Sequence, residues 1–234
     1  MQIILTKTKL FAVTLISATT LTVACSPDIS SPTQTSDTKV TEASNKQGMK
    51  QPDNMNMNGE GMSHDMSMDL GPADEDYNLR FIDGMAIHHQ GAVVMAEEAL
   101  TKAQHPELKK LAQDIIAAQK LEISQMTTWR TDWYPQADNT PMAYHSQMGH
   151  MMAMTDEQKQ GMMMSMDLGN ADAEFDLRFI NAMLPHHEGA LVMAKDALNK
   201  SQRPEIKKLA QDILTSQQQE IEQMKQWRKD WYNQ

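Results

Sequence analysis

Apolar residues recur at helical spacing in two long stretches of the chain, and each stretch predicts a pair of helices. Between about residue 74 and residue 102, one face of a helix with about 100° per residue is apolar. That face carries Phe81, Met85, Ala92, Ala96 and Ala99. Pro106 then marks the start of a second helix, which runs to about residue 133, because proline is favoured at the first helical position. The pattern therefore predicts a helical hairpin.

The same hairpin pattern occurs twice. Residues 66–136 align with residues 164–234 at a constant offset of 98 without a gap, and 44 of the 71 positions are identical. A hairpin with one apolar face cannot bury that face alone, whereas two such hairpins can bury their faces against each other. We therefore predict an all-α protein, an antiparallel four-helix bundle built from two repeated helical hairpins, with a disordered N-terminal tether.

The N-terminus has the features of an export signal. Two lysines precede the apolar run Leu10 to Ala24, and this run of about 15 residues is shorter than the roughly 20 that a membrane-spanning helix needs. Cys25, the only cysteine, follows it in a pattern that resembles a bacterial lipobox, except that Thr22 stands where leucine is usual. We predict that residues 1–24 are a signal peptide and that the exported protein is lipid-anchored at Cys25 in the periplasm or cell envelope. Cleavage without lipidation and an uncleaved anchor helix are the alternatives.

Two segments outside the repeats are poor in aliphatic side chains. Residues 25–65 are rich in Ser, Thr, Asn, Gln and Pro, so they bury too little apolar area to offset the entropy lost on ordering. We predict a disordered, methionine-containing tether there. Residues 137–163 are predicted to be a Met/His-rich linker of low order between the repeat at 66–136 and the repeat at 164–234.

The charge of the chain narrows the choice of partner. A formal net charge of −10 argues against nucleic acid, whose binding depends on Lys and Arg that neutralise phosphates. The same charge is compatible with a cationic ligand, although it is also common in soluble bacterial proteins. Charge alone does not identify the ligand.

A Met-x-x-His-His cluster lies on the first helix of each repeat. The clusters consist of Met85, His88 and His89 in the first copy and of Met183, His186 and His187 in the second. Glu122 and Glu220 interrupt the apolar stripes of the second helices, and a buried carboxylate is costly unless it is paired. We expect these glutamates to face the histidines. Four duplicated histidines beside methionines favour a metal site over core histidines that merely pair with the glutamates.

Methionine outside the helices favours a soft metal. Of 22 methionines, six lie in residues 49–68 and nine in residues 142–166, where the polar surroundings offer no obvious core for Met to fill. Thioethers are soft and neutral, which suits copper(I), with silver(I) as a chemical look-alike, better than magnesium, calcium or manganese. Zinc would prefer Cys, His and carboxylate ligands. Composition alone, with low-complexity drift as the alternative, adds as candidate loop ligands His64, Met66, His145, Met148, His150, Met151 and Met152.

The clusters lie within segments that resemble a known family signature. The segments at 81–92 and 179–190, extended by the run Gln-x-x-Glu-Ile-x-x-Met-x-x-Trp at 119–129 and 217–227, are similar to domain of unknown function 305, whose copper-handling members are called CopM-like proteins. The resemblance implies a ferritin-like helical bundle, binding of copper and silver, and a part in copper tolerance in the periplasm. It also implies that the two clusters are the ligands, with Met126 and Met224 facing them. Ile87 departs from the proline that the family usually has there.

These observations favour a non-enzymatic copper(I) binder that sequesters the ion or passes it to a copper-delivery or efflux partner. A ferritin-like dinuclear oxidase is the enzymatic alternative, but such sites use Glu-x-x-His pairs, and no glutamate lies three residues before either histidine pair. A structural or interaction module with incidental methionines is the third hypothesis. The oligomeric state is left open.

Overall fold

The computed structural model describes residues 69–234. The predicted signal peptide, Cys25, the whole of the predicted tether and the methionine-rich residues 49–68, including His64 and Met66, lie outside the described residues. None of the helices in the described part of the chain combines the length and apolar content needed to cross a lipid bilayer.

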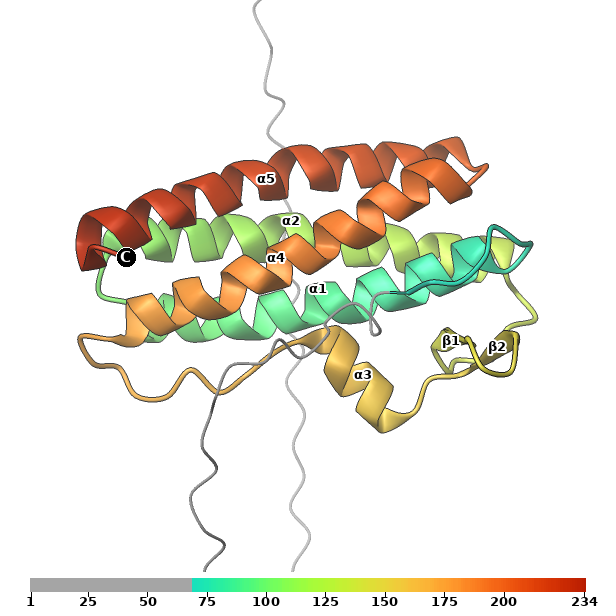
Figure 1. Ribbon diagram of the computed structural model, residues 1–234, viewed down its shortest axis with the longest axis horizontal. Coiled ribbons are helices and arrows are strands. Elements are labelled where there is room, and N and C mark those ends of the chain that lie inside the picture. Colours follow the sequence, from blue (N-terminus) through green and yellow to red (C-terminus); the bar gives the residue numbers. More distant parts are fainter. Residues whose placement is uncertain (1–68) are drawn as a thin grey trace, which may run out of the picture. The chain divides into compact units, whose positions relative to one another are not determined.

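Four long helices form the two predicted hairpins (Figure 1). They are α1 (Tyr77–Lys102), α2 (Pro106–Trp133), α4 (Phe175–Lys200) and α5 (Pro204–Tyr232). Proline occupies the first turn of α2 and of α5, as expected. The first helix begins later than predicted, because Asp74 accepts a hydrogen bond from the amide of Asp76 at 3.1 Å and lies 2.9 Å from Arg80, which holds a turn before α1.

The two hairpins contact each other mainly through α1 and α4, which lie side by side in Figure 1. Polar contacts join the ends of the hairpins. Asp176 of α4 accepts hydrogen bonds from the amides of Gln104 and His105, at the start of α2. The ring of His105 stacks on Trp231 of α5 with centroids 3.7 Å apart. At the opposite end, the guanidinium of Arg203 lies 3.8 Å above the ring of Trp133. The repeats are thus joined by reciprocal contacts.

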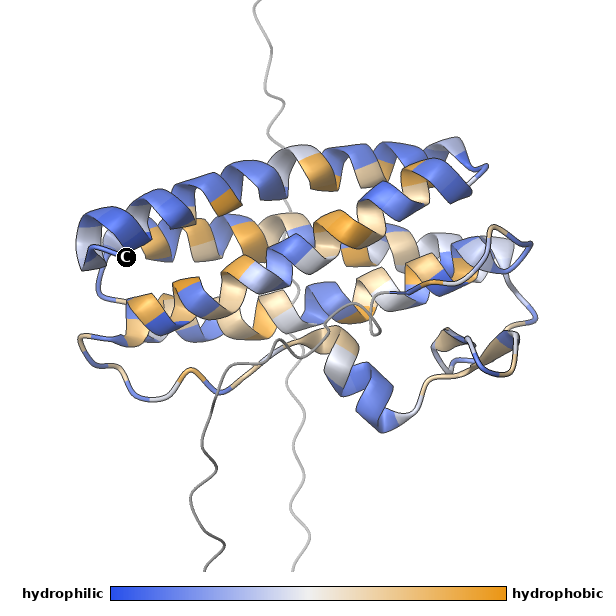
Figure 2. Cartoon of the chain, in the orientation of Figure 1, coloured by the Kyte–Doolittle hydropathy of each residue, from blue (hydrophilic) through white to orange (hydrophobic). Residues whose placement is uncertain are grey.

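Figure 2 shows hydrophobic residues interspersed with hydrophilic ones along the four long helices. The apolar core consists of two clusters, and each contains residues of both repeats. One cluster combines the second half of α1 with the first half of α4, and it includes Ala96 and Phe179. The other combines the first half of α1 with the second half of α4, and it includes Phe81 and Ala194. Because α1 and α4 contribute opposite halves to each cluster, they run antiparallel, and their midpoints lie between the clusters.

The segment between the repeats has regular structure, so the prediction of a low-order linker is wrong. It contains a two-stranded antiparallel sheet, β1 (Met142–His145) and β2 (His150–Ala153), followed by the short helix α3 (Asp156–Met163). Gly149, at φ +70°, allows the turn between the strands. Thr155 and Gln158 form a capping box at the start of α3. The fold is therefore mainly helical rather than purely helical.

Buried methionines attach this segment to α1. Met154 and Met162 are only 4% and 5% exposed, and both belong to the second apolar cluster. Asp83 of α1 accepts a hydrogen bond from the amide of Met142 at 2.9 Å and lies 2.6 Å from Nε of Arg130, which fixes β1 against the first hairpin. The inference that loop methionines have no core to fill is wrong for these two residues.

Candidate metal centre

The four histidines of the repeated clusters lie at the midpoints of α1 and α4, and they are buried, as expected from their place on the apolar faces of the two helices. His88, His89, His186 and His187 are each at most 1% exposed. The rings of His88 and His186 are stacked, with centroids 3.8 Å apart and planes inclined by 14°. Two clusters that lie 98 residues apart in the sequence therefore meet in one buried layer, between the two apolar clusters.

The outer histidine of each copy faces the predicted glutamate. Nε2 of His89 lies 2.7 Å from Oε2 of Glu122, and Nε2 of His187 lies 2.7 Å from Oε2 of Glu220. Both distances are those of a hydrogen bond, but only the His187 pair has hydrogen-bond alignment. Because a carboxylate accepts, each ring is expected to carry its proton on Nε2. A carboxylate in this position orients an imidazole and raises its basicity as a metal ligand.

The other ring nitrogen of each outer histidine is available. Nδ1 of His89 and Nδ1 of His187 are buried and have no hydrogen-bond partner within residues 69–234. A buried polar atom without a partner is uncommon in a folded protein. With the proton on Nε2, Nδ1 presents a lone pair, so these two atoms are suited to bind a cation.

The inner histidines are instead covered by backbone carbonyls. Nδ1 of His88 lies 2.7 Å from the carbonyl oxygen of Met162, and its Nε2 lies 2.9 Å from that of His186. Nε2 of His186 lies 3.1 Å from the carbonyl oxygen of Met163, while its Nδ1 has no partner in the described residues. The end of α3 therefore covers both inner rings, and His88 binds a metal only if these carbonyls move.

Burial keeps the inner histidines neutral. It lowers the pKa of His88 to about 4, although the two carbonyls facing its ring favour the protonated form. Burial also holds the pKa of His186 well below its ordinary value, and the neighbouring imidazoles lower it further. At neutral pH these rings therefore present no positive charge that would repel an incoming cation.

The four methionines predicted as ligands in the long helices are all fully buried and fall into two sets. Met85 and Met126 belong to one apolar cluster, and Met183 and Met224 belong to the other. The predicted thioether ligands therefore lie on the two sides of the histidine layer, one from each helix of each hairpin. Within residues 69–234 no group of three or more His, Cys, Asp or Glu side chains is arranged to hold a metal ion. A metal bound in this layer would need thioether ligands in addition to imidazole.

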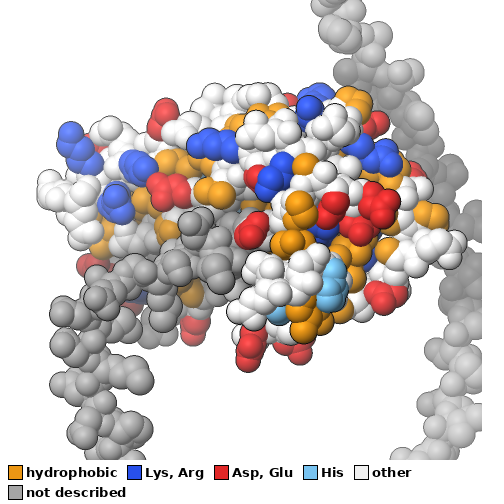
Figure 3. Space-filling view, turned by 45° about the vertical axis from the view of Figure 1, so that its right-hand side comes forward, with side chains coloured by type: hydrophobic (Ala, Val, Ile, Leu, Met, Phe, Trp, Pro, Cys, Tyr) orange, Lys and Arg blue, Asp and Glu red, His pale blue; other side chains and the backbone are white. Residues whose placement is uncertain are grey.

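The strand pairing brings several candidate loop ligands together. His145 lies directly opposite His150, and Met152, which pairs with Ala143, is on the same side of this two-stranded sheet. Met148 lies in the turn and is 59% exposed. Figure 3 shows histidine beside hydrophobic side chains at the surface. Met151 pairs with Tyr144 and faces the other side, so the structure separates it from this group.

Sequence reasoning missed the buried methionines that attach the segment around α3 to α1. Met154 and Met162 lie eight residues apart, on either side of the capping box formed by Thr155 and Gln158. The pattern Thr-x-x-Gln signals the start of a helix and could have revealed α3. The carbonyl contacts of Met162 and Met163 with the histidines carry no sequence signal, because every residue has a carbonyl.

Comparison with known proteins gives consistent results. A family model described as "Domain of unknown function (DUF305)" matches residues 78–228. The chain is similar to the solved structure of CopM in its Cu(II)-bound form, with 44% identity and a TM-score of 0.53, over 66% of this chain and 97% of CopM. For the Cu(I)-bound form of CopM the identity is 40% and the TM-score 0.51, and for the silver-soaked form they are 39% and 0.52, over the same shares of the two chains.

A further relative is uncharacterized protein L153 of Acanthamoeba polyphaga mimivirus, which is 47% identical over 49 residues. That match covers 21% of this chain and 32% of the mimivirus protein, so it spans about a third of that relative. The similarity to L153 is therefore limited to this stretch of 49 residues.

Proposed function

The chain belongs to the family described as domain of unknown function DUF305, and we propose that it binds copper(I) through methionine and histidine ligands, with silver(I) as a surrogate. The proposal rests above all on the buried histidine layer, in which carboxylates orient His89 and His187 while their Nδ1 atoms have no partner in the described residues. The likeness to CopM, solved with copper and with silver, supports it.

The donor atoms of the layer fit a soft monovalent ion. Thioether sulfur and imidazole nitrogen suit copper(I), whereas carbonyl and carboxylate oxygen suit harder ions. Thioethers have no proton to lose, so an ion that binds to Met85, Met126, Met183 or Met224 does not compete with protons for sulfur. Glu220 already accepts a hydrogen bond from His187, and Oε2 of Glu122 lies 2.7 Å from Nε2 of His89, so we assign both glutamates to supporting the histidines rather than to binding the metal.

We place the protein at the cell envelope, where it sequesters copper or passes it to a delivery or efflux partner and so supports copper tolerance. Thiols tend to oxidise to disulfides outside the cytoplasm, which favours methionine as the sulfur ligand there. We also infer that the two hairpins form a single antiparallel four-helix bundle, because each apolar cluster combines residues of both repeats. Fatty-acid labelling of the wild type and of Cys25→Ser tests the lipid anchor.

Titration of the purified full chain with copper(I), in competition with a chromogenic copper(I) chelator, tests the helix site. Replacing both Met85 and Met183 by leucine preserves volume and apolar character and should weaken binding by at least about tenfold, or about 1.4 kcal/mol. The matched control replaces Met95 and Met193, which are equally buried in the same helices, and should bind as the wild type does. Equal affinity of both double variants would remove Met85 and Met183 from the ligand set.

A further inference from the structure

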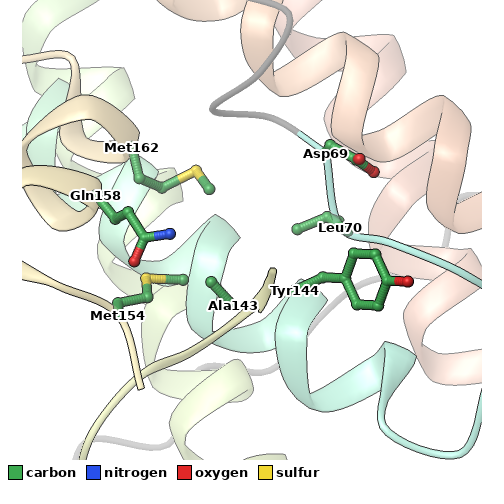
Figure 4. Close-up of a pocket in the computed structure, with 7 residues that line it drawn as sticks. All are labelled: Asp69, Leu70, Ala143, Tyr144, Met154, Gln158 and Met162. Carbon is green, nitrogen blue, oxygen red and sulfur yellow. The ribbon is translucent and has the colours of Figure 1, made fainter. Parts of the chain in front are cut away.

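A small cavity lies between α3, β1 and the residues that lead into α1. It has a volume of about 70 Å³ and is lined by Asp69, Leu70, Ala143, Tyr144, Met154, Gln158 and Met162. Figure 4 shows Met154, Gln158 and Met162 on one side of the cavity and Asp69, Leu70 and Tyr144 on the other. A water molecule needs roughly 10–15 Å³ of such space, so the cavity has room for a metal ion.

The two thioethers reach the cavity because of the way α3 begins. Thr155 accepts a hydrogen bond from the amide of Gln158, and Gln158 Oε1 accepts one from the amide of Thr155. This capping box fixes the first turn of α3, so Met154 just before the helix and Met162 near its end lie against the same space. With Oε1 of Gln158 occupied by the cap, sulfur provides the soft donor atoms among these three side chains.

Met162 also connects the cavity to the histidine layer. Its sulfur and methyl group lie 3.8 and 3.4 Å from where a Cβ on Gly84 of α1 would stand, so the thioether packs against α1 at Gly84. The carbonyl oxygen of the same residue lies 2.7 Å from Nδ1 of His88. A change in the position of Met162 therefore changes the contact that covers His88.

We propose that Met154 and Met162 form a separate soft-metal site, which binds copper(I) or silver(I) through their two sulfur atoms. The inference rests on the proposed function and adds a site outside the helical layer, at residues that none of the expected ligand sets included. Because the ion is bound by neutral sulfur, no proton is released when it enters. Asp69 at the rim of the cavity attracts a cation. Met162 lines the cavity, and its carbonyl oxygen also faces His88, so an ion bound to its sulfur lies beside the contact that covers the histidine layer.

NMR of the full chain with isotopically labelled methionine methyl groups tests this site, with silver(I) as the titrant. The methyl signals of Met154 and Met162 should shift as silver is added. Replacing both residues by leucine should remove one bound equivalent of silver. The matched control, in which Met95 and Met193 are replaced by leucine, should retain the wild-type stoichiometry.

The outcomes separate this inference from the proposed function. If the wild type binds silver while the signals of Met154 and Met162 stay unchanged, the cavity site is wrong and the proposed function is unaffected. If no methionine signal shifts at any silver concentration, the proposed function fails as well. Should the leucine variant fail to fold, the wild-type signals alone decide, because they report directly on the two sulfur atoms.

Discussion

Replacing Gly91 of α1 by alanine should detach α3 from the histidine layer. A Cβ at this position would overlap the carbonyl oxygen of Met163 and would lie 3.0 Å from its Cγ. The clash is with backbone, so no change of rotamer relieves it. The end of α3 must move away, and its carbonyls then leave His88 and His186.

The size of the effect follows from the contacts that are lost. Exposing the side chain of Met162 costs about 2 kcal/mol, and the two imidazole–carbonyl hydrogen bonds contribute about 1 kcal/mol each. Alanine in place of glycine favours the helix by about 1 kcal/mol. The net loss is about 3 kcal/mol, which for a domain of this size lowers the melting temperature by roughly 6–12 °C.

Gly84→Ala is the matched control, because it makes the same change in the same helix. Its Cβ would meet the flexible ends of Leu70 and Met162 at 3.3 and 3.4 Å, which can shift by a few tenths of an ångström. Thermal unfolding followed by circular dichroism measures the stability of the metal-free proteins, and amide exchange over residues 156–163 measures the docking of α3. If the Gly91→Ala and Gly84→Ala variants have the same melting temperature and the same amide protection in α3, the inference that α3 packs against α1 at Gly91 is wrong.

Three further predictions follow from buried polar groups. Asp83→Ala should destabilise the protein by about 3–5 kcal/mol, measured by urea unfolding, because it removes the buried carboxylate that pairs with Arg130 and accepts from the amide of Met142. Asp83→Asn should destabilise it less. The pKa of His88 is about 4 in the folded state and about 6.5 in the unfolded chain, so the unfolded chain binds the proton first as the pH falls. The metal-free protein should therefore lose up to about 3 kcal/mol between pH 6.5 and pH 4, and a His88→Gln variant whose unfolding shows the same pH dependence would contradict this. Glu122→Gln combined with Glu220→Gln should weaken copper(I) binding about 10- to 100-fold in chelator competition, and unchanged affinity would show that the carboxylates do not support the ligands.

The duplicated hairpins were predictable because their signals are local and occur twice. Spacing at 3.6 residues placed the histidines on the inner faces of α1 and α4, and the cost of a buried carboxylate predicted that Glu122 and Glu220 would face them. Both expectations are confirmed by the pairs with His89 and His187. The glutamates nevertheless pair only with the outer histidines, since the inner ones are covered by backbone.

The segment between the repeats was not predictable from composition. Its polar, methionine-rich sequence suggested a flexible linker, yet Met154 and Met162 supply the apolar side chains that attach it to α1. Two features determine how α3 packs against α1. Gly91 has no side chain, which leaves space for the carbonyl of Met163, and the carbonyls of Met162 and Met163 face His88 and His186. These contacts join residues that are far apart in the sequence, so the sequence alone does not reveal them. A glycine within a helix indicates that another segment packs closely against it, but the amino-acid sequence does not identify that segment.

A crystal soaked with silver(I) and measured at a wavelength at which silver scatters anomalously tests the central claim most directly. The account predicts anomalous peaks at bonding distance from Sδ of Met85 or Met126 and of Met183 or Met224, beside Nδ1 of His89 and His187. Silver bound only at the exposed sheet of residues 142–153, with the buried layer empty, would contradict it.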